Sequence, residues 1–89
     1  MPKSISQQKK ETASHVGALK QAAGRIGTSQ DMYTLYANKL KAVKDAAGMK
    51  EWYYAFSKRV NAQISQDHSE AMFMRSQLES IRSITGLQR

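Results

Sequence analysis

The chain has 89 residues, of which 40% are hydrophobic and none is cysteine, so disulfide bonds and thiolate metal sites are excluded. Fourteen Lys and Arg side chains against seven Asp and Glu give a formal net charge of +7, which favours a polyanionic partner through long-range attraction. A domain of this size buries little surface on folding, so we expect a single domain over residues 1–89 that forms a homo-oligomer.

The composition predicts an all-α protein. Pro2 is the only proline, Val and Ile are sparse, and no strand-like alternation of useful length occurs. After a flexible basic segment, residues 1–4, a first amphipathic helix is predicted over residues 5–25. Its apolar side consists of Ile5, Thr12, Val16, Leu19, Ala23 and Ile26. Gly24 and Gly27 are its candidate ends, because glycine tolerates the backbone conformation that closes a helix.

A second helix is predicted over residues 29–47, with Thr28 or Ser29 as its N-cap and Asp31 in the position of a capping box. Its apolar side consists of Met32, Leu35, Tyr36, Leu40, Val43 and Ala47. Beyond Gly48 the apolar side is rotated by roughly 110–120°, which one straight helix cannot accommodate. We therefore predict a break at Gly48, with this glycine in the left-handed conformation.

One long helix is predicted over residues 49–84. Its apolar residues keep one phase, with no glycine or proline between them: they are Met49, Trp52, Tyr53, Phe56, Val60, Ile64, Ala71, Met74, Leu78 and Ile81. The segment DHSE at residues 67–70 is an alternative, because it resembles the capping box of a separate helix. The expected fold is a helical bundle of two shorter helices followed by one long C-terminal helix.

The positive charge supplies the candidate residues for binding nucleic acid or another anion. They are Lys9, Lys10, Lys20, Lys41, Lys44, Lys58, Arg59, Arg75 and Arg82. Arg75, Arg82 and Arg89 recur every seven residues beside the apolar side of the long helix. Pairing with carboxylates is favoured over phosphate contact for this stripe, because Glu79 lies within it. The alternative for the charge as a whole is that it only keeps the protein soluble.

Three apolar residues lie off the apolar side of the long helix and are candidates for an interface. They are Tyr54, Met72 and Phe73. They support an alternative function, a protein-interaction module such as an assembly subunit or an inhibitor that docks on a larger protein target. Asp67 falls on the apolar side itself, where an unpaired carboxylate is costly.

A helix-turn-helix DNA-binding regulator is the least favoured alternative, based on the segment VKDAAGMKEWYYAF. Lys44 stands where such a motif buries a small residue, and the helix that follows is too long and too aromatic for a recognition helix. As core residues, Trp52, Tyr53 and Phe56 need no function.

Enzyme chemistry has no signature in this sequence. His15 and His68 lack partners at metal-binding spacing, and no glycine-rich loop follows a strand. We expect no catalytic residue, no metal and no cofactor.

Membrane segments are not expected either. The apolar runs fall far short of the about 20 residues that a membrane helix needs, and residues 1–10 lack the apolar core of a secretory signal. The expectation is a cytoplasmic, non-enzymatic helical protein with no membrane partner, which binds nucleic acid or a phosphate-bearing ligand such as a nucleotide as an oligomer.

Overall fold

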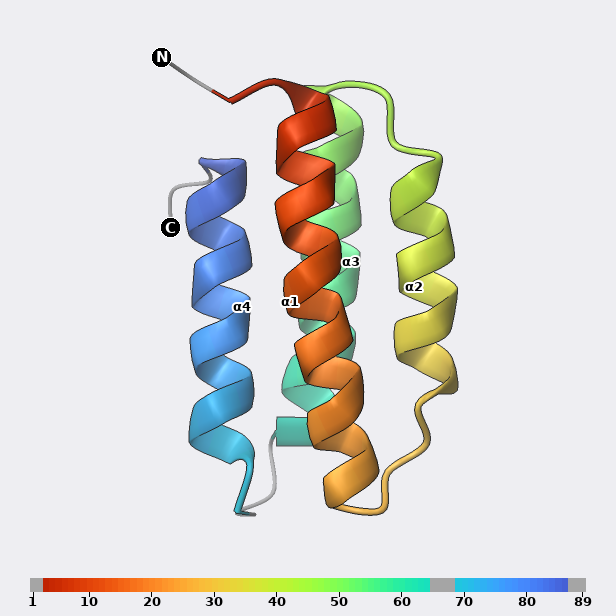
Figure 1. Ribbon diagram of the computed structural model, residues 1–89, viewed down its shortest axis with the longest axis vertical. Coiled ribbons are helices and arrows are strands. Elements are labelled where there is room, and N and C mark those ends of the chain that lie inside the picture. The colour runs from red at the N-terminus through yellow and green to blue at the C-terminus, as the bar shows by residue number, and fades with distance from the viewer. Residues whose placement is uncertain (1–2, 65–68, 87–89) are drawn as a thin grey trace.

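The computed structural model describes residues 3–64 and 69–86, and within these ranges it contains four helices and no strand. The helices are α1 (Ile5–Arg25), α2 (Asp31–Lys41), α3 (Ala46–Ile64) and α4 (Ala71–Thr85). Successive helices run in opposite directions, and α1 and α3 each pack against both α2 and α4 (Figure 1). This is an up-down-up-down four-helix bundle, which confirms the predicted all-α helical bundle.

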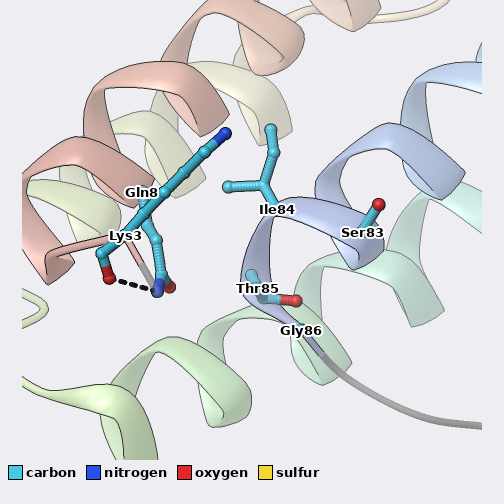
Figure 2. Close-up of a pocket in the computed structure, with 6 residues that line it drawn as sticks. All are labelled: Lys3, Gln8, Ser83, Ile84, Thr85 and Gly86. Atoms are coloured by element: carbon cyan, nitrogen blue, oxygen red, sulfur yellow. Dashed lines mark hydrogen bonds between the residues drawn. The ribbon is translucent and has the colours of Figure 1, made fainter. Parts of the chain in front are cut away.

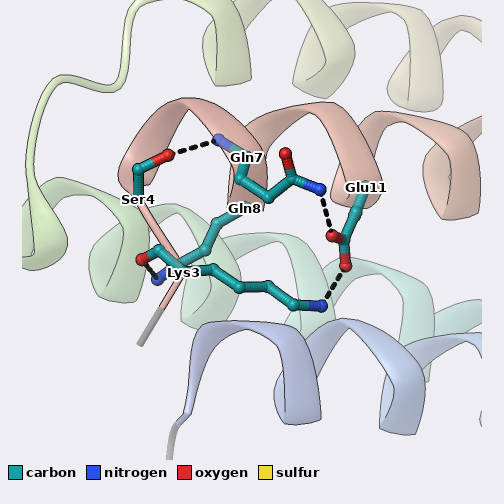
Figure 3. A network of polar contacts seen from close by, with 5 residues as sticks. All are labelled: Lys3, Ser4, Gln7, Gln8 and Glu11. Atoms are coloured by element: carbon teal, nitrogen blue, oxygen red, sulfur yellow. Dashed lines mark hydrogen bonds and ion pairs between the residues drawn. The ribbon is translucent and has the colours of Figure 1, made fainter. Parts of the chain in front are cut away.

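Helix α1 spans the residues over which the sequence predicts a first helix. It begins after Ser4, whose Oγ accepts a hydrogen bond from the Gln7 N–H at 3.1 Å (Figure 3). It ends before Gly27, which has a φ of +75°. Glycine suits this position because a side chain disfavours left-handed backbone.

The break between α2 and α3 lies earlier than predicted, so the prediction of a turn at Gly48 was wrong. Helix α2 ends at Lys41, four residues follow, and Gly48 lies in the first turn of α3. The Oδ1 of Asp45 accepts a hydrogen bond from the Gly48 N–H at 2.8 Å, as an N-cap residue does. Gly48 does not have a positive φ. The rotated apolar side required a break, but the capping carboxylate of Asp45 decided where it falls.

Helix α2 turns most of its predicted apolar side to the core, since Tyr36 and Leu40 are buried, but one predicted core residue is replaced by another. It begins at Asp31 rather than residue 29, so its N-cap is Gln30 and the predicted N-cap at Thr28 or Ser29 was wrong. The Ser29 Oγ accepts a hydrogen bond from the Asp31 N–H at 3.3 Å. Tyr33 is fully buried, whereas Leu35, predicted as a core residue, is 48% exposed. The Tyr33 hydroxyl donates a hydrogen bond to Gln63 Oε1 of α3 at 2.6 Å, so this tyrosine is buried with its polar atom satisfied.

The prediction of a single long helix over residues 49–84 was wrong as well. Helix α3 ends at Ile64, and α4 begins at Ala71 and runs in the opposite direction. Ile64 and Ala71 are seven residues apart, close to two helical turns, so the apolar phase continues whether the chain goes straight or reverses. The alternative, a separate helix that starts after the segment DHSE, agrees with the start of α4, while Asp67 and His68 themselves lie outside the described residues.

The core combines residues from all four helices. Its buried hydrophobic residues are Val16, Leu19, Ala22, Ala23, Tyr33, Tyr36, Leu40, Met49, Trp52, Tyr53, Phe56, Val60, Ile64, Ala71, Met74, Leu78 and Ile81. The prediction that Trp52, Tyr53 and Phe56 belong to the core is confirmed. Because α3 uses its aromatic side for packing, only its opposite side is open to a partner.

Candidate polyanion-binding surface

One end of the bundle brings together lysines that are far apart in the sequence. The start of α1 lies there beside the end of α2 and the loop that leads to α3 (Figure 1). The lysines of this end, called the basic end below, are Lys9, Lys10, Lys39, Lys41 and Lys44. The sequence alone showed them as scattered charges on two helices.

Lys9 holds the basic end together. Its Nζ donates hydrogen bonds to the backbone oxygens of Lys41 at 2.8 Å and of Val43 at 2.7 Å. A cation in this position satisfies carbonyl groups that the end of a helix leaves free and opposes the helix dipole. The ammonium of Lys9 is therefore used within the fold, where it holds the loop that carries Lys44.

Lys10, Lys41 and Lys44 are exposed, and no ion pair joins any of them to a carboxylate of the described residues. The ammonium of Lys39 lies over the ring of Tyr36, 5.4 Å from its centroid. Asp45 is the acid of the loop, and its Oδ1 is engaged by the backbone of α3. The basic end thus presents three lysines whose charge is not offset by a bound carboxylate.

The ion pairs of the described residues involve other cations, although one of them, Lys3–Glu11, lies at the start of α1 and so at the same end of the bundle. They are Lys3–Glu11, Arg25–Glu70 and Glu79–Arg82 (Figure 3 shows the first). The hydrogen bonds from Lys3 and from Gln7 lower the pKa of Glu11 below its usual value. The bond between the Glu70 carboxylate and the Arg25 guanidinium ties the start of α4 to the end of α1.

The predicted arginine stripe separates in the structure. Arg82 donates two hydrogen bonds to Glu79 Oε2 of the same helix, at 2.6 and 3.1 Å, and this contact raises the pKa of Arg82 above its usual value. Arg75 is exposed and has no carboxylate partner within the described ranges. Arg89 lies outside them. Pairing with a carboxylate of the same helix therefore accounts for Arg82.

A shallow groove lies between α3 and α4 beside Arg75. Its volume is about 250 Å³, and its lining residues are Tyr53, Asn61, Arg75, Leu78 and Glu79. The volume is below that of typical pockets for drug-sized ligands, so the groove suits part of a larger ligand better than a whole small molecule.

A second open pocket, of about 290 Å³, lies between the residues before α1 and the end of α4 (Figure 2). Lys3 and Gln8 line one side, and residues 83–86 line the other. The Gln8 Nε2 donates a hydrogen bond to the Lys3 backbone oxygen at 3.1 Å. The Lys3 ammonium is already paired with Glu11, so the free charge needed for an anion site is lacking here.

The other predicted binding residues do not join the basic end. Lys20 lies in the second half of α1, while Lys58 and Arg59 are exposed on α3. Lys39 and Lys50 were not among the predicted site residues. Lys50 precedes Tyr54 by four residues, and Lys58 follows it by four, a helical spacing that could have been found in the sequence.

The three predicted interface residues are exposed but do not form one patch. Tyr54 is 48% exposed and lies near the middle of α3. Met72, 83% exposed, and Phe73, 38% exposed, lie in the first turn of α4, at the end of the bundle away from the basic end. The Phe73 ring contacts the Arg25 guanidinium, which is 5.5 Å from its centroid, so Phe73 is partly accounted for within the chain.

The described residues form no group of His, Cys, Asp and Glu that could hold a metal ion. His15 lies at the edge of the core, where its Nδ1 is 2.7 Å from the Gln77 Oε1 of α4. Within the same ranges, no helix has the length and apolar character needed to cross a bilayer. Helices α2 and α3 run antiparallel, which gives no support to a helix-turn-helix, whose helices cross at a steep angle.

Comparisons of this chain with protein-family models, with curated proteins and with solved structures find no match.

Proposed function

We propose that this chain is a small, basic, non-enzymatic binding protein that engages a polyanion, nucleic acid or another phosphate-bearing ligand, through its basic end. The observation that carries the proposal is the charge of Lys10, Lys41 and Lys44, gathered at one end of the bundle, with which no carboxylate of the described residues forms an ion pair. Phosphates are attracted to such a surface, and the release of their counterions contributes to binding.

The position of the charge also supports the proposal. The two hydrogen bonds from Lys9 hold the end of α2 and the following loop against α1. Lysines on a surface held in this way lose less conformational freedom on binding than lysines on a mobile tail.

The test is electrophoretic retardation of duplex DNA, single-stranded DNA and RNA at two salt concentrations. We expect retardation that weakens steeply with salt. Replacing Lys41 and Lys44 with glutamine should flatten the salt dependence for duplex DNA by about two units, since each phosphate contact contributes about 0.9. The control is the double variant Lys20→Gln and Arg59→Gln, which removes the same charge away from the basic end. Absence of retardation at low salt would refute the proposal.

A second candidate is a protein-interaction module, whose partner is a larger protein target or a second copy of the chain in a homo-oligomer. The 83% exposure of Met72 favours this candidate. An apolar side chain this exposed gains from burial against a partner. Light scattering of the wild type and of Met72→Gln tests the oligomer. A mass of one chain at micromolar concentration for the wild type would remove the oligomeric form of this candidate.

A further inference from the structure

The exposed side of α3 carries an aromatic ring between two cations. Lys50, Tyr54 and Lys58 are all exposed and follow one another at intervals of four residues. Residues with this spacing lie along one line of a helix, so each lysine is displaced from the tyrosine by about 6 Å along the helix axis. The line begins one turn into α3, next to the basic end (Figure 1).

The groove between α3 and α4 adjoins this line. The ring centroids of Tyr53, which lines the groove, and of Tyr54 are 5.8 Å apart. On the far side of the groove is the exposed Arg75. The groove's acid, Glu79, already accepts hydrogen bonds from Arg82, so its charge is partly offset.

The exposed acid of this part of α3, Glu51, lies on the side of the line away from the groove. It is about 100° around the helix axis from Lys50, in the direction opposite to Tyr53. Tyr54 therefore has lysines before and after it along the helix and Arg75 across the groove. Glu51 lies on the side of the helix away from the groove.

An exposed ring flanked by cations matches the chemistry of single-stranded nucleic acid. The bases of a single strand have accessible faces that stack on aromatic side chains, and the phosphates on either side contact lysine or arginine. In a duplex the faces of the bases are stacked on one another and are not accessible to a side chain. An anion without bases could not stack on the ring of Tyr54. Tyr54 is 48% exposed, so a base can reach its side chain.

We propose that Lys50, Tyr54 and Lys58, with Arg75 across the groove, bind single-stranded nucleic acid, with Tyr54 stacking on one base and the cations contacting the neighbouring phosphates. This inference rests on the proposed function and names the form of nucleic acid that the protein prefers. The bound strand extends from the basic end along α3.

The first test measures binding of a labelled oligothymidine of about 12 nucleotides, a length within the range of single-strand sites, by fluorescence anisotropy. Replacing Tyr54 with alanine should weaken binding about 5- to 150-fold, the loss that corresponds to one stacked base. Tyr54→Phe, which keeps the ring, should bind as the wild type does. Far-UV circular dichroism and thermal unfolding check that both variants remain folded.

An abasic strand of the same length separates stacking from charge. It keeps the phosphates and sugars but has no bases, so Tyr54→Ala and the wild type should bind it equally. Unchanged binding of oligothymidine by Tyr54→Ala, or an equal loss on both strands, would overturn the inference. If the wild type binds both strands but Tyr54→Ala changes neither affinity, this inference fails while the proposed function stands. If the wild type binds no nucleic acid at low salt, both fail.

The flanking lysines give an independent test. Replacing Lys50 and Lys58 with glutamine should flatten the salt dependence for the single strand by about 1.4 units, since each contact contributes about 0.7. Lys20→Gln with Arg59→Gln is the matched control, because it removes equal charge away from this line. An equal effect of the two double variants would show that only the total charge matters and would contradict the assigned position.

Discussion

The two halves of the core are built from different side chains. Between α2 and α3 it is aromatic: the ring of Phe56 lies 4.8 Å from Trp52, 5.4 Å from Tyr36 and 5.9 Å from Tyr33, measured between centroids. Between α1 and α4 it is aliphatic and small, with residues such as Ala22, Ala23, Ala71, Met74, Leu78 and Ile81. Large rings hold α2 and α3 apart, whereas small residues let α1 and α4 pack closely along their length.

The halves also differ in how their buried polar atoms are paired. In the α2–α3 half, Trp52 Nε1 donates a hydrogen bond to the Tyr36 backbone oxygen at 2.9 Å, and the Tyr33 hydroxyl bonds to Gln63. In the α1–α4 half, the hydroxyl of the fully buried Thr12 has no hydrogen-bond partner among the described residues. Buried directional bonds therefore fix the register of α2 against α3, while the polar contacts between α1 and α4, His15–Gln77 and Arg25–Glu70, lie at the edge of the core.

The largest expected effect compares one buried residue from each half. Phe56→Ala should lower the free energy of unfolding by about 3–5 kcal/mol, because it removes a ring that contacts three others. Met74→Ala, at an equally buried position in α4, should cost less, within about 2–5 kcal/mol. Urea denaturation of both variants measures the difference. A greater loss for Met74→Ala would show that the aromatic half is not the stronger one.

The next prediction concerns pH and the aromatic half. Burial raises the pKa of Tyr33 from its usual value of 10.0 to about 12. Because the pKa of Tyr33 is higher in the folded than in the unfolded chain, the contribution of protonated Tyr33 to the free energy of unfolding is fully present below pH 10. It is lost between about pH 10 and 12, at no more than about 1.4 kcal/mol per pH unit.

Urea denaturation across this pH range measures the loss, with Tyr33→Phe as the test variant. The variant should be less stable than the wild type at neutral pH by about 1 kcal/mol, because it lacks the hydrogen bond of the hydroxyl. Since phenylalanine cannot ionise, the stability of the variant should then fall less steeply with pH than that of the wild type. Tyr54→Phe is the control at an exposed tyrosine. Identical pH profiles for wild type and Tyr33→Phe would contradict the prediction.

Replacing Thr12, in the α1–α4 half of the core, should change the free energy of unfolding by a smaller amount and in the opposite direction. Thr12→Val keeps the shape of the side chain and removes the unpaired hydroxyl, so we expect stabilisation by about 1 kcal/mol. Thermal unfolding measures the change. Thr12→Ser, which keeps the hydroxyl and loses a methyl group, should destabilise. A valine variant less stable than the wild type would mean that the hydroxyl has a partner in solution.

An effect of similar size concerns the N-caps of one helix from each half. Asp45 caps α3 at 2.8 Å, and Ser4 caps α1 at 3.1 Å. Replacing either with alanine should cost about 0.5–2 kcal/mol, and more for Asp45, because its charge also interacts with the helix dipole. Asp45→Asn should retain most of the cap. Equal stability of Asp45→Ala and the wild type would show that this carboxylate does not fix the start of α3.

Much of the candidate site could be predicted from residue types, but not its assembly. The unpaired lysines were identifiable as candidates from charge alone, whereas their gathering at one end depends on α1 lying beside the end of α2. The apolar character of Tyr54 and Met72 off the core side was also visible in the sequence. Their placement on two antiparallel helices was not, because the reversal between α3 and α4 replaces a separation of about 27 Å along one continuous helix.

The sequence by itself determined the helical composition, the extent of α1 and the burial of Trp52, Tyr53 and Phe56, because these depend on local propensity and on a periodicity within one helix. Only the tertiary structure decided that the chain reverses between Ile64 and Ala71. A spacing of seven residues leaves the apolar phase unchanged in either case, so the sequence pattern is the same for one long helix and for two. The reversal allows α4 to cover the apolar side of α1. If α3 continued as one straight helix, the residues of α4 would lie further from α1. The burial of this apolar side therefore depends on the whole fold.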